Sequence, residues 1–417
     1  MPSLEGVAAR RAALQMLDAV LRRGRTLDSA AQASRDVSGS DRALAIAIAG
    51  EVLRRVPDLD SLIDGATRKR LPDDSKARMV LRIALVQKIG LGTPEHAVVA
   101  TALPLVVGGP RRLVHGVLGT LLRRGLPKID APHLPADVEE RWAEAWGAET
   151  VEAARRQIAK RPPLDLSFTS DGAAEGFAAV NGGTALAPRH VRLADAGPVE
   201  ELPGFRDGDW WVQDLAASLP SRLIPEDAGD VLDLCSAPGG KAMQLAAARH
   251  DVTAVDSSEQ RLQRLRENLD RTSLSADLVT ADILKWQPGR EFDAVLLDAP
   301  CSATGTFRRH PEVLYRARPR IIAELAELQA ALLARACQWV RPGGMLVYSV
   351  CSLEPQEGEQ VIGSFVSANP SFRLVPPEPI ADWLQPTAEG WLRILPGLLE
   401  SKGGLDGFFT ARLVRSG

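Results

Sequence analysis

The sequence has few cysteines, and their spacing excludes two common uses of this residue. Only four occur in 417 residues, namely Cys235, Cys301, Cys337 and Cys351, and no two of them form a C-x-x-C pair. Zinc sites need closely spaced ligands, and the disulfide frameworks of small secreted domains need many cysteines. We therefore expect no metal site, no disulfide framework and a reducing compartment.

Long hydrophobic runs and a secretion signal are also lacking. The longest apolar run, residues 97–107, is shorter than the roughly 20 residues that a membrane span needs, and Pro104 interrupts it. The chain starts Met-Pro-Ser-Leu-Glu, without the basic segment and apolar stretch of a signal peptide. The sequence predicts a cytoplasmic protein with no membrane partner.

The charge is nearly balanced overall but unevenly distributed. The whole chain has 50 Lys and Arg against 53 Asp and Glu, whereas residues 1–128 have 21 against 12. A basic front section on an acidic remainder favours a polyanionic partner for the front section. The length predicts two or three domains, and composition and pattern divide the chain at about residues 128 and 208.

Residues 1–128 form the first predicted domain, and their apolar periodicity is helical throughout. Apolar residues recur at helical spacing within 7–21, 42–56, 75–89 and 111–122, and no strand pattern interrupts them. The spacing predicts an all-α domain of at least five helices, with the helix at 42–56 ended by Pro57.

Arginine pairs lie mostly near the predicted helix ends of this domain. The pairs are Arg22-Arg23, Arg54-Arg55, Arg111-Arg112 and Arg123-Arg124. Stabilisation of the helix dipole and binding of phosphates both fit this placement, and the sequence does not decide between them.

Residues 129–208 are predicted to form a linker and a small connector. Three prolines between 127 and 135 indicate the linker, and residues 137–160 have the pattern of two polar helices. Trp142 and Trp146 fall on one face of the first helix, so we expect them to be packing anchors rather than platforms for nucleic-acid bases. From 161 to 208 the pattern is short, Gly- and Pro-rich and weakly alternating, which predicts a small mixed α/β connector.

Residues 209–417 form the third predicted domain, in which strands and helices alternate. Strands are expected near 231–235, 252–256, 277–280, 293–298, 345–350 and 408–414, and helices near 215–223, 241–249, 258–270, 320–340 and 355–367. This alternation is typical of a parallel or mostly parallel sheet.

The third domain is organised around residues 230–241, Asp-Val-Leu-Asp-Leu-Cys-Ser-Ala-Pro-Gly-Gly-Lys. A buried strand, a glycine turn and the start of a helix follow one another, which is where an α/β domain binds its cofactor. Asp256 and Asp282 close the next two strands, where their carboxylates are placed to accept ribose hydroxyls and an adenine amino group. This order of elements favours an adenosine-containing cofactor.

Two cysteines and a carboxylate are expected at the same edge of the sheet. Asp298 and Cys301 follow the fourth strand and Cys351 follows the fifth, whereas Cys337 lies among apolar helical neighbours and Cys235 within the cofactor turn. A thiolate that adds to C6 of a pyrimidine makes C5 nucleophilic enough to accept a methyl group. A carboxyl group at the N3/N4 edge would stabilise the charge that develops on the ring, and a second thiol would assist the final release.

Five motifs carry a resemblance to a known family. They are Asp-Leu-Cys-Ser-Ala-Pro-Gly-Gly-Lys at 233–241, Asp-Ala-Pro-Cys-Ser-Ala-Thr-Gly-Thr at 298–306, Val-Cys-Ser-Leu-Glu-Pro-Gln-Glu at 350–357, Val-Gln-Asp-Leu-Ala-Ala at 212–217 and Asp-Gly-Phe-Phe at 406–409. In these motifs the sequence resembles the NOL1/NOP2/Sun family of RNA cytosine-5 methyltransferases, over most of residues 205–414. Residues 5–125 show a weaker similarity to a NusB-type helical RNA-binding domain.

The resemblance implies a fold, a reaction and a set of roles. The fold would be an N-terminal all-α NusB-like domain, a small α/β connector and a C-terminal Rossmann-like domain that binds S-adenosyl-L-methionine. The reaction would be methylation of a cytosine C5 in RNA, with 16S rRNA as the expected substrate and tRNA as the alternative. Cys351 would be the nucleophile, Cys301 would help to release the product, and Asp298 would face the cytosine. The cofactor would be held by Cys235, Ser236, Ala237, Pro238, Gly239, Gly240, Lys241, Asp256, Asp282 and Asp298.

Three positions depart from the family pattern. Val350 precedes Cys351 where the family usually has Thr, and His115 stands in the helical domain where Asn is more usual. The connector reads Pro-Leu-Asp-Leu-Ser-Phe from Pro163, without the Arg-x-Asn that often follows this strand in the family. These departures concern RNA contacts more than the reaction.

Two other functions remain open from the residues. A dehydrogenase would use Asp256 for the ribose of NAD, but the sequence lacks G-x-G-x-x-G and this function leaves Cys301 and Cys351 without a task. A non-catalytic RNA-binding or ribosome assembly factor would work through the helical domain alone and would tolerate substitution of Cys351. We expect a monomer in each case.

Overall fold

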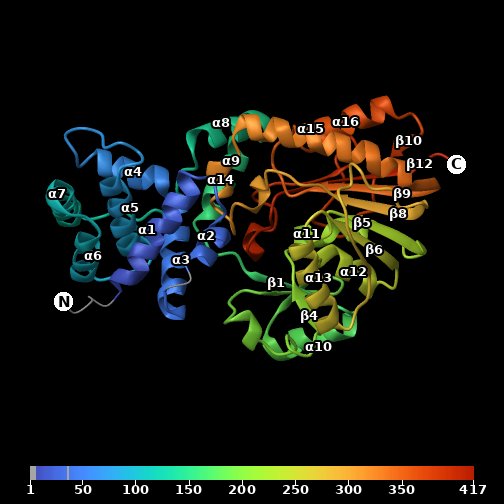
Figure 1. Cartoon of the computed structure of the whole chain (residues 1–417), viewed down its shortest axis with the longest axis horizontal. Helices are drawn as coiled ribbons and strands as arrows, with labels where there is room; N and C mark the ends of the chain where they lie inside the picture. Colours follow the sequence, from blue (N-terminus) through green and yellow to red (C-terminus); the bar gives the residue numbers. More distant parts are fainter. Residues whose placement is uncertain (1–5, 35–36) are drawn as a thin grey trace. The chain divides into compact units, whose positions relative to one another are not determined.

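The computed structural model describes residues 6–34 and 37–417, which form two compact units (Figure 1). The first contains the described residues up to Arg161 together with Phe307–Ala317, and the second contains Pro162–Thr306 and Arg318–Gly417. The boundaries predicted near 128 and 208 fall inside these units, so the three-part division stays a prediction. No helix in the described ranges is both long and apolar enough to cross a membrane.

The first unit is helical, as predicted. Its α-helices are α1 (Val7–Leu21), α2 (Leu27–Ala33), α3 (Gly39–Leu53), α4 (Val56–Asp64), α5 (Lys76–Ile89), α6 (Glu95–Ala102), α7 (Gly108–Arg124), α8 (Ala136–Trp146), α9 (Ala148–Ile158) and α14 (Val313–Arg316). Helix α5 is the centre of the core, since every residue from Ala77 to Gln87 is buried. The buried guanidinium of Arg82 is compensated by Asp60 of α4, which accepts two hydrogen bonds of 2.7 Å from it.

The prediction that Pro57 ends a helix is wrong. Helix α3 ends earlier, at Leu53, and begins after Ser38, whose Oγ accepts a hydrogen bond from the Asp41 backbone N–H at 3.2 Å. Pro57 lies instead in the first turn of α4. The first turn tolerates proline because the missing N–H has no partner within the helix there.

A short segment from later in the chain belongs to the first unit. Trp142 of α8 is fully buried with its ring 5.4 Å from that of Phe307, which confirms its predicted packing role. Tyr315 Oη donates to the Leu53 carbonyl at 2.8 Å, and Arg316 Nε donates to the Gly24 carbonyl at 2.8 Å. Residues 307–317 are therefore held by hydrogen bonds to the end of α3 and to the turn after α1, more than 250 residues earlier in the chain.

The second unit begins with the small α/β connector predicted from the sequence. Four strands pair in the order β2 (Thr184–Ala187), β3 (His190–Leu193), β1 (Leu164–Phe168), β4 (Trp210–Val212), accompanied by α10 (Asp171–Asn181). All three pairings are antiparallel. Strand β4 lies beyond the predicted boundary at 208 and nevertheless completes this sheet.

The larger sheet of the second unit is the predicted Rossmann-like core. Its strand order is β10 (Phe372–Leu374), β12 (Phe408–Arg415), β9 (Val340–Val350), β8 (Phe292–Asp298), β5 (Asp230–Leu234), β6 (Asp251–Asp256), β7 (Asp277–Thr280), and β11 (Leu392–Ile394) also pairs with β12. The pairings from β9 to β7 are parallel, and those of β12 are antiparallel. Strands β10 and β11 were not predicted, because three residues carry no recognisable alternation.

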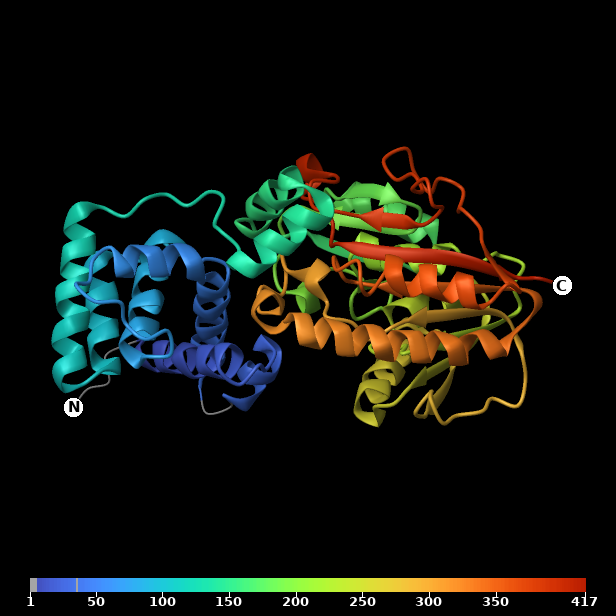
Figure 2. The ribbon, with the colours of Figure 1, turned by 90° about the horizontal axis from the view of Figure 1, so that it is seen from above.

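Helices cover both faces of this sheet. Helices α11 (Leu215–Arg222), α12 (Gly240–Ala247) and α13 (Glu259–Thr272) lie on one face, and α15 (Pro319–Ala336) and α16 (Glu359–Ala368) lie on the other (Figures 1 and 2). In a parallel sheet covered in this way the strand ends at the carboxyl edge remain accessible, and the loops that leave that edge carry the chemistry.

Candidate active site

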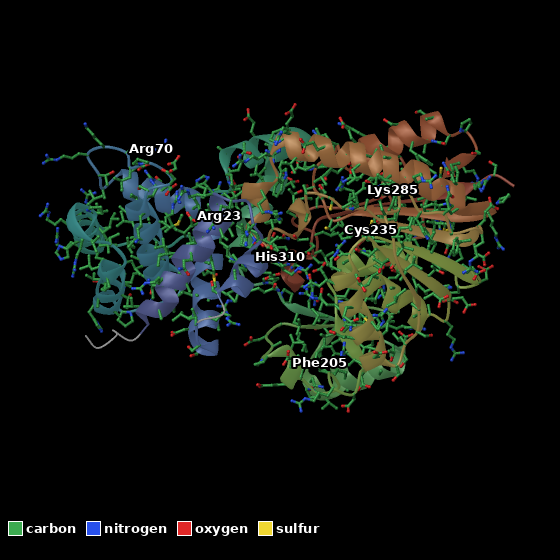
Figure 3. The ribbon with its side chains drawn as sticks, viewed as in Figure 1. Arg23, Arg70, Phe205, Cys235, Lys285 and His310 are labelled. Carbon is green, nitrogen blue, oxygen red and sulfur yellow. The ribbon has the colours of Figure 1, made fainter. Side chains whose placement is uncertain are left out.

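Residues 230–241 form the predicted strand, tight turn and helix. Strand β5 ends at Leu234, Cys235 follows with a positive φ of 59° (Figure 3), and Gly239 has a φ of 109° just before α12. A Cβ at position 239 would lie 2.1 Å from Leu265 Cδ1, so a side chain does not fit there. No side chain caps α12, and its first backbone N–H groups are therefore available to a ligand.

The predicted acidic residues differ in how they relate to this turn. Asp256 is fully buried, and its Oδ1 accepts hydrogen bonds from Ser258 N at 2.8 Å and Arg261 Nη2 at 2.7 Å. Its Oδ2 receives only a long bond of 3.4 Å from Ala237 N of the turn, which leaves acceptor capacity on the cofactor side. Asp282 is half exposed and makes local contacts, with Leu284 N at 3.1 Å and Lys285 at 3.4 Å.

Lys241 and Asp298 form a direct link between the turn and strand β8. Lys241 Nζ donates to Asp298 Oδ2 at 2.7 Å and lies 5.2 Å from the centre of the Phe408 ring. The other oxygen of Asp298 accepts a hydrogen bond from Ser349 Oγ at 2.9 Å. Lys241 was expected to serve the cofactor alone, and its pairing with Asp298 was not predicted.

Cys301 and Cys351 lie side by side, as expected from their positions after neighbouring parallel strands. Their sulfur atoms are 3.5 Å apart, and both residues are partly buried. The hydrogen bond with Cys351, followed by burial, raises the pKa of Cys301 well above the usual value of a thiol.

The loops that carry these cysteines are joined by backbone hydrogen bonds. Ala299 N donates to the Ser349 carbonyl at 3.0 Å, and Gly305 N donates to the Cys351 carbonyl at 3.0 Å. The Gly305 carbonyl accepts in turn from Gly407 N at 2.8 Å. A Cβ at position 305 would lie 2.0 Å from the Gly407 carbonyl oxygen, which gives a steric reason for both glycines and for the Asp-Gly-Phe-Phe motif.

A buried carboxylate that was not predicted contacts the residues that follow the two cysteines. Glu357 is fully buried and accepts hydrogen bonds from Ser302, Ser352 and Gln329. Glu357 is the last residue of the motif at 350–357. A single acidic residue in a loop has no periodicity or spacing that predicts its hydrogen-bond partners.

The remaining two cysteines lie apart from this pair. Burial, followed by the nearby charges of Asp298 and Asp256, raises the pKa of Cys235 far above the usual value, which fits a packing role in the turn. Cys337 was predicted within a helix at 320–340, but α15 ends at Ala336 and Cys337 begins a short 3-10 turn. It is half-buried there.

Packing explains Val350, which stands next to Cys351 where the resembled family usually has Thr. Its side chain is fully buried in the sheet, and it pairs with Phe409 of β12. The position lies within the apolar core, where a valine needs no hydrogen-bond partner.

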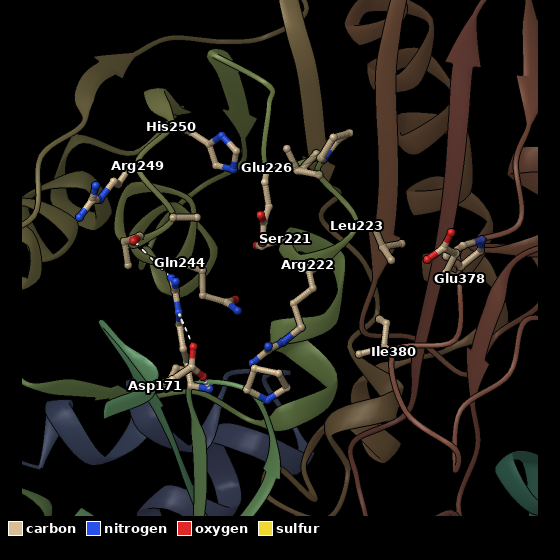
Figure 4. A pocket seen from close by; sticks show the side chains of 18 of the residues that line it. Asp171, Ser221, Arg222, Leu223, Glu226, Gln244, Arg249, His250, Glu378 and Ile380 are labelled. Carbon is tan, nitrogen blue, oxygen red and sulfur yellow. Dashed lines mark hydrogen bonds and ion pairs between the residues drawn. The ribbon is translucent and has the colours of Figure 1, made fainter. Parts of the chain in front are cut away.

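A separate pocket of about 860 Å³ lies in the second unit (Figure 4). It is lined by residues of the connector, α11, the end of α12 and the segment at 377–380, including Asp171, Arg222 and Gln244. None of the predicted site residues lines it, so it does not belong to the cysteine site.

The turn at 235–241 has the polar groups that S-adenosylmethionine requires. The free N–H groups of α12 suit a carboxylate. In the part of the chain that the structure describes, both carboxyl oxygens of Asp233 and the Ser236 hydroxyl are buried without a hydrogen-bond partner. Burial, followed by the charge of Asp298, raises the pKa of Asp233. The unpaired oxygens of Asp233 and Ser236 suit the ammonium group of an amino-acid ligand, and the N–H groups of α12 suit its carboxylate. The residues therefore fit this cofactor.

Two parts of the chain match known family models. Residues 220–414 match the family model for the 16S rRNA methyltransferase RsmB/F, and residues 7–123 match the NusB family. Ribosomal RNA small subunit methyltransferase B from Klebsiella pneumoniae is 33% identical over 449 residues and covers 99% of each chain. The protein of that name from Xylella fastidiosa is 35% identical over 437 residues, again covering 99% of each.

Solved structures share the fold. The crystal structure of PH0851 superposes with a TM-score of 0.74 at 23% identity and covers 99% of both chains. A methyltransferase homologue from Pyrococcus horikoshii has a TM-score of 0.57 at 26% identity, covering 71% of this chain and 98% of its own. The match to a methyltransferase family supports S-adenosylmethionine as the cofactor, as predicted. By its similarity over nearly the whole length to these relatives, the chain belongs to the RsmB/F family of 16S rRNA methyltransferases, with a NusB-family domain at its N-terminal end.

Proposed function

We propose that the protein methylates C5 of a cytosine in 16S rRNA through a covalent bond between Cys351 and C6 of the base. The observation that carries the proposal is the pair of sulfur atoms 3.5 Å apart, next to a carboxylate at the same edge of the sheet. A methyltransferase acting on an exocyclic nitrogen or a ribose oxygen has no need of two adjacent thiols.

The proposed reaction starts with addition of the Cys351 thiolate to C6. The electron pair of the C5–C6 bond then becomes available at C5, which takes the methyl group that bound S-adenosylmethionine supplies. The Cys351 sulfur then leaves C6 and takes up the proton of the Cys301 thiol, the resulting Cys301 thiolate accepts the C5 proton, and the C5–C6 double bond is restored. The base must leave its stack to enter such a site.

The family resemblance assigns the roles of the two cysteines. Cys351 is proposed as the nucleophile, and Cys301, whose sulfur lies 3.5 Å from that of Cys351, is proposed to assist the release step. The distance is short enough for the two thiols to exchange a proton while the Cys351 sulfur leaves C6.

Asp298 is proposed to face the N3/N4 edge of the cytosine. Lys241 and Ser349 hold its two oxygens, so the carboxyl group is fixed in orientation before a base arrives. The proposed cofactor residues are Asp256, Asp282, the turn from Cys235 to Lys241, and Asp298 itself. Of these, Asp256 and the turn are already in contact, and Asp282 would reach the adenine from a half-exposed position.

The helical unit is proposed to bind the RNA. The Arg54-Arg55 pair does not take part, because both side chains are buried and paired with Glu51. Exposed arginines remain at the ends of α1 and α7, and Figure 3 marks Arg23 and Arg70 among the exposed arginines of this unit. Arg23 pairs with Asp18 and Arg70 with Asp73, but these ion pairs are exposed, so the guanidinium groups remain accessible to phosphates.

The deciding experiment is methyl transfer by the purified protein to 16S rRNA, to the small ribosomal subunit and to tRNA, with bisulfite sequencing of the products. A single 16S cytosine that becomes protected supports the proposal, and the Cys351→Ala variant should give no protection while the Cys337→Ala control keeps it. If a tRNA cytosine became protected instead, the substrate would be tRNA and the proposed chemistry would stand. If the Cys351→Ala variant still protected the cytosine, the covalent mechanism would be contradicted. If the wild type bound the RNA without modifying it, a ribosome assembly factor would be favoured.

A further inference from the structure

One buried carboxylate connects the two loops that carry Cys301 and Cys351. Glu357 Oε1 accepts hydrogen bonds from Ser302 N at 2.8 Å and from Gln329 Nε2 at 3.0 Å. Its Oε2 accepts from the hydroxyl groups of Ser302 and Ser352. The side chain is completely shielded from solvent, so water does not compete for these bonds.

The two serines are the residues that directly follow the cysteines. Ser302 comes after Cys301, and Ser352 comes after Cys351. A single carboxylate therefore holds equivalent positions of both loops. A second contact supports it, because Thr304 Oγ1 accepts from Leu353 N at 3.0 Å and lies 3.3 Å from Ser352 Oγ.

The chemistry of this cluster requires a carboxylate. The four donors to Glu357 are neutral groups, two bonds to each oxygen, and only an ionised carboxyl group accepts at both oxygens without donating. Glutamine has the same shape but carries an N–H2 group in place of one oxygen. At the Oε1 position this group would face the Ser302 N–H and Gln329 Nε2, and at the Oε2 position it would require both serine hydroxyls to accept instead of donate. Burial raises the pKa of Glu357, and the hydrogen bonds oppose that shift.

We propose that Glu357 is a positioning residue that sets the distance between the Cys301 and Cys351 sulfur atoms. The effect on sulfur spacing follows from the geometry alone, while its effect on catalysis rests on the proposed function. At 3.5 Å the sulfurs are within the range of a sulfur hydrogen bond, and proton transfer between them tolerates little added separation. Glu357 touches neither sulfur and would act only through the serines.

The test uses a reaction of the two thiols that needs neither RNA nor cofactor. Diamide takes one hydrogen from each thiol and leaves a Cys301–Cys351 disulfide, and the rate of this oxidation reports the separation of the sulfurs in the folded protein. We would measure it for the full-length wild type, Glu357→Gln and Ser302→Ala. Asp165→Asn is the matched control, because Asp165 is also buried, accepts two 2.6 Å hydrogen bonds from Arg192, and lies in the connector sheet.

We expect Glu357→Gln to slow disulfide formation and lower kcat for methyl transfer by about tenfold or more, since each lost bond to a charged group weakens the link between the loops. KM for S-adenosylmethionine should stay within about twofold, because the cofactor turn is untouched. Ser302→Ala should give a smaller loss in both, and Asp165→Asn should lower the melting temperature without slowing disulfide formation.

Two results would overturn the proposal. The first is disulfide formation at the wild-type rate in folded Glu357→Gln. If Glu357→Gln does not fold, the same rate in folded Ser302→Ala has this meaning. The other is an equal slowing in Asp165→Asn, which would make loss of stability the cause. If the wild type methylates no RNA, the proposed function fails, and the oxidation rates still decide whether Glu357 sets the spacing.

Discussion

The sulfur atoms of Cys301 and Cys351 lie 3.5 Å apart although 50 residues separate them in the chain. Strands β8 and β9 are adjacent and parallel, so the loops that follow them leave the sheet at the same edge. Strand order brings the loops together, and hydrogen bonds between them decide the spacing of the thiols.

We predict that Cys301→Ala traps an intermediate and that Cys351→Ala forms none. Without the Cys301 thiol the product stays attached to Cys351, so a covalent protein–RNA adduct should accumulate and migrate as a retarded band on a denaturing gel. Turnover should fall by about 100-fold, the lower range for loss of a proton-transfer group. The double variant should give no adduct, and an adduct that persists in Cys351→Ala would assign the nucleophile to another residue.

Gly305→Ala is predicted to destabilise the second unit and to lower activity. Its Cβ would lie 2.0 Å from the Gly407 carbonyl oxygen, and backbone on both sides must move to make room. We expect a loss of about 2 kcal/mol in the free energy of unfolding, as for an overpacked core. Gly363→Ala in α16 is the control: no atom lies within 4 Å of its added Cβ, so it should be neutral or slightly stabilising. Denaturant unfolding followed by tryptophan fluorescence distinguishes the two.

The Asp165–Arg192 pair predicts a pH dependence of stability. Burial alone would raise the pKa of Asp165, but hydrogen bonds from Arg192 and His190 outweigh it and hold the pKa well below the usual value of 3.8. A depressed carboxyl pKa gives stability that is present above the unfolded-state pKa and lost as the pH falls below it. The wild type should exceed Asp165→Asn by about 3 kcal/mol at neutral pH.

This difference should shrink between about pH 5 and about pH 2. Asp130→Asn provides the comparison, because Asp130 is exposed and pairs only with exposed Lys128, so its removal should cost less than about 1 kcal/mol. A wild-type advantage over Asp165→Asn that is unchanged at low pH would show that Asp165 does not contribute through its charge.

Arginines on α7 are predicted to contribute to RNA affinity through phosphates. Arg111, Arg112 and Arg123 are exposed, and replacing all three by Gln should weaken binding and reduce the slope of log K against log salt by up to about 2 to 3. Filter binding at several salt concentrations measures both. Arg55→Gln is the contrasting variant, since Arg55 is buried against Glu51, and it should lower the melting temperature with the salt slope unchanged. An unchanged salt slope in the triple variant would mean that these three arginines of α7 do not contact RNA phosphates.

Much of this protein was predictable because the relevant signals are local. Apolar residues at helical spacing were enough for the all-α front section, and the turn after Leu234 is dictated by a glycine that no other residue replaces at 239. The approach of Cys301 and Cys351 was also predictable, because the ends of adjacent parallel strands share one edge. Sequence alone determined the longer elements, the order of the motifs and the chemical types at the site, whereas the three-residue strands β10 and β11 were missed.

Tertiary structure alone decided which of these residues are paired and which stay free. Asp298 is held by Lys241, Arg54 and Arg55 are buried against Glu51, and Glu357 connects two loops through Ser302 and Ser352. Pro57 starts a helix where it was expected to end one, and residues 307–317 belong with helices far earlier in the chain. Each of these depends on partners distant in sequence, whose positions follow from packing and hydrogen bonding in the folded chain and leave no trace in local periodicity.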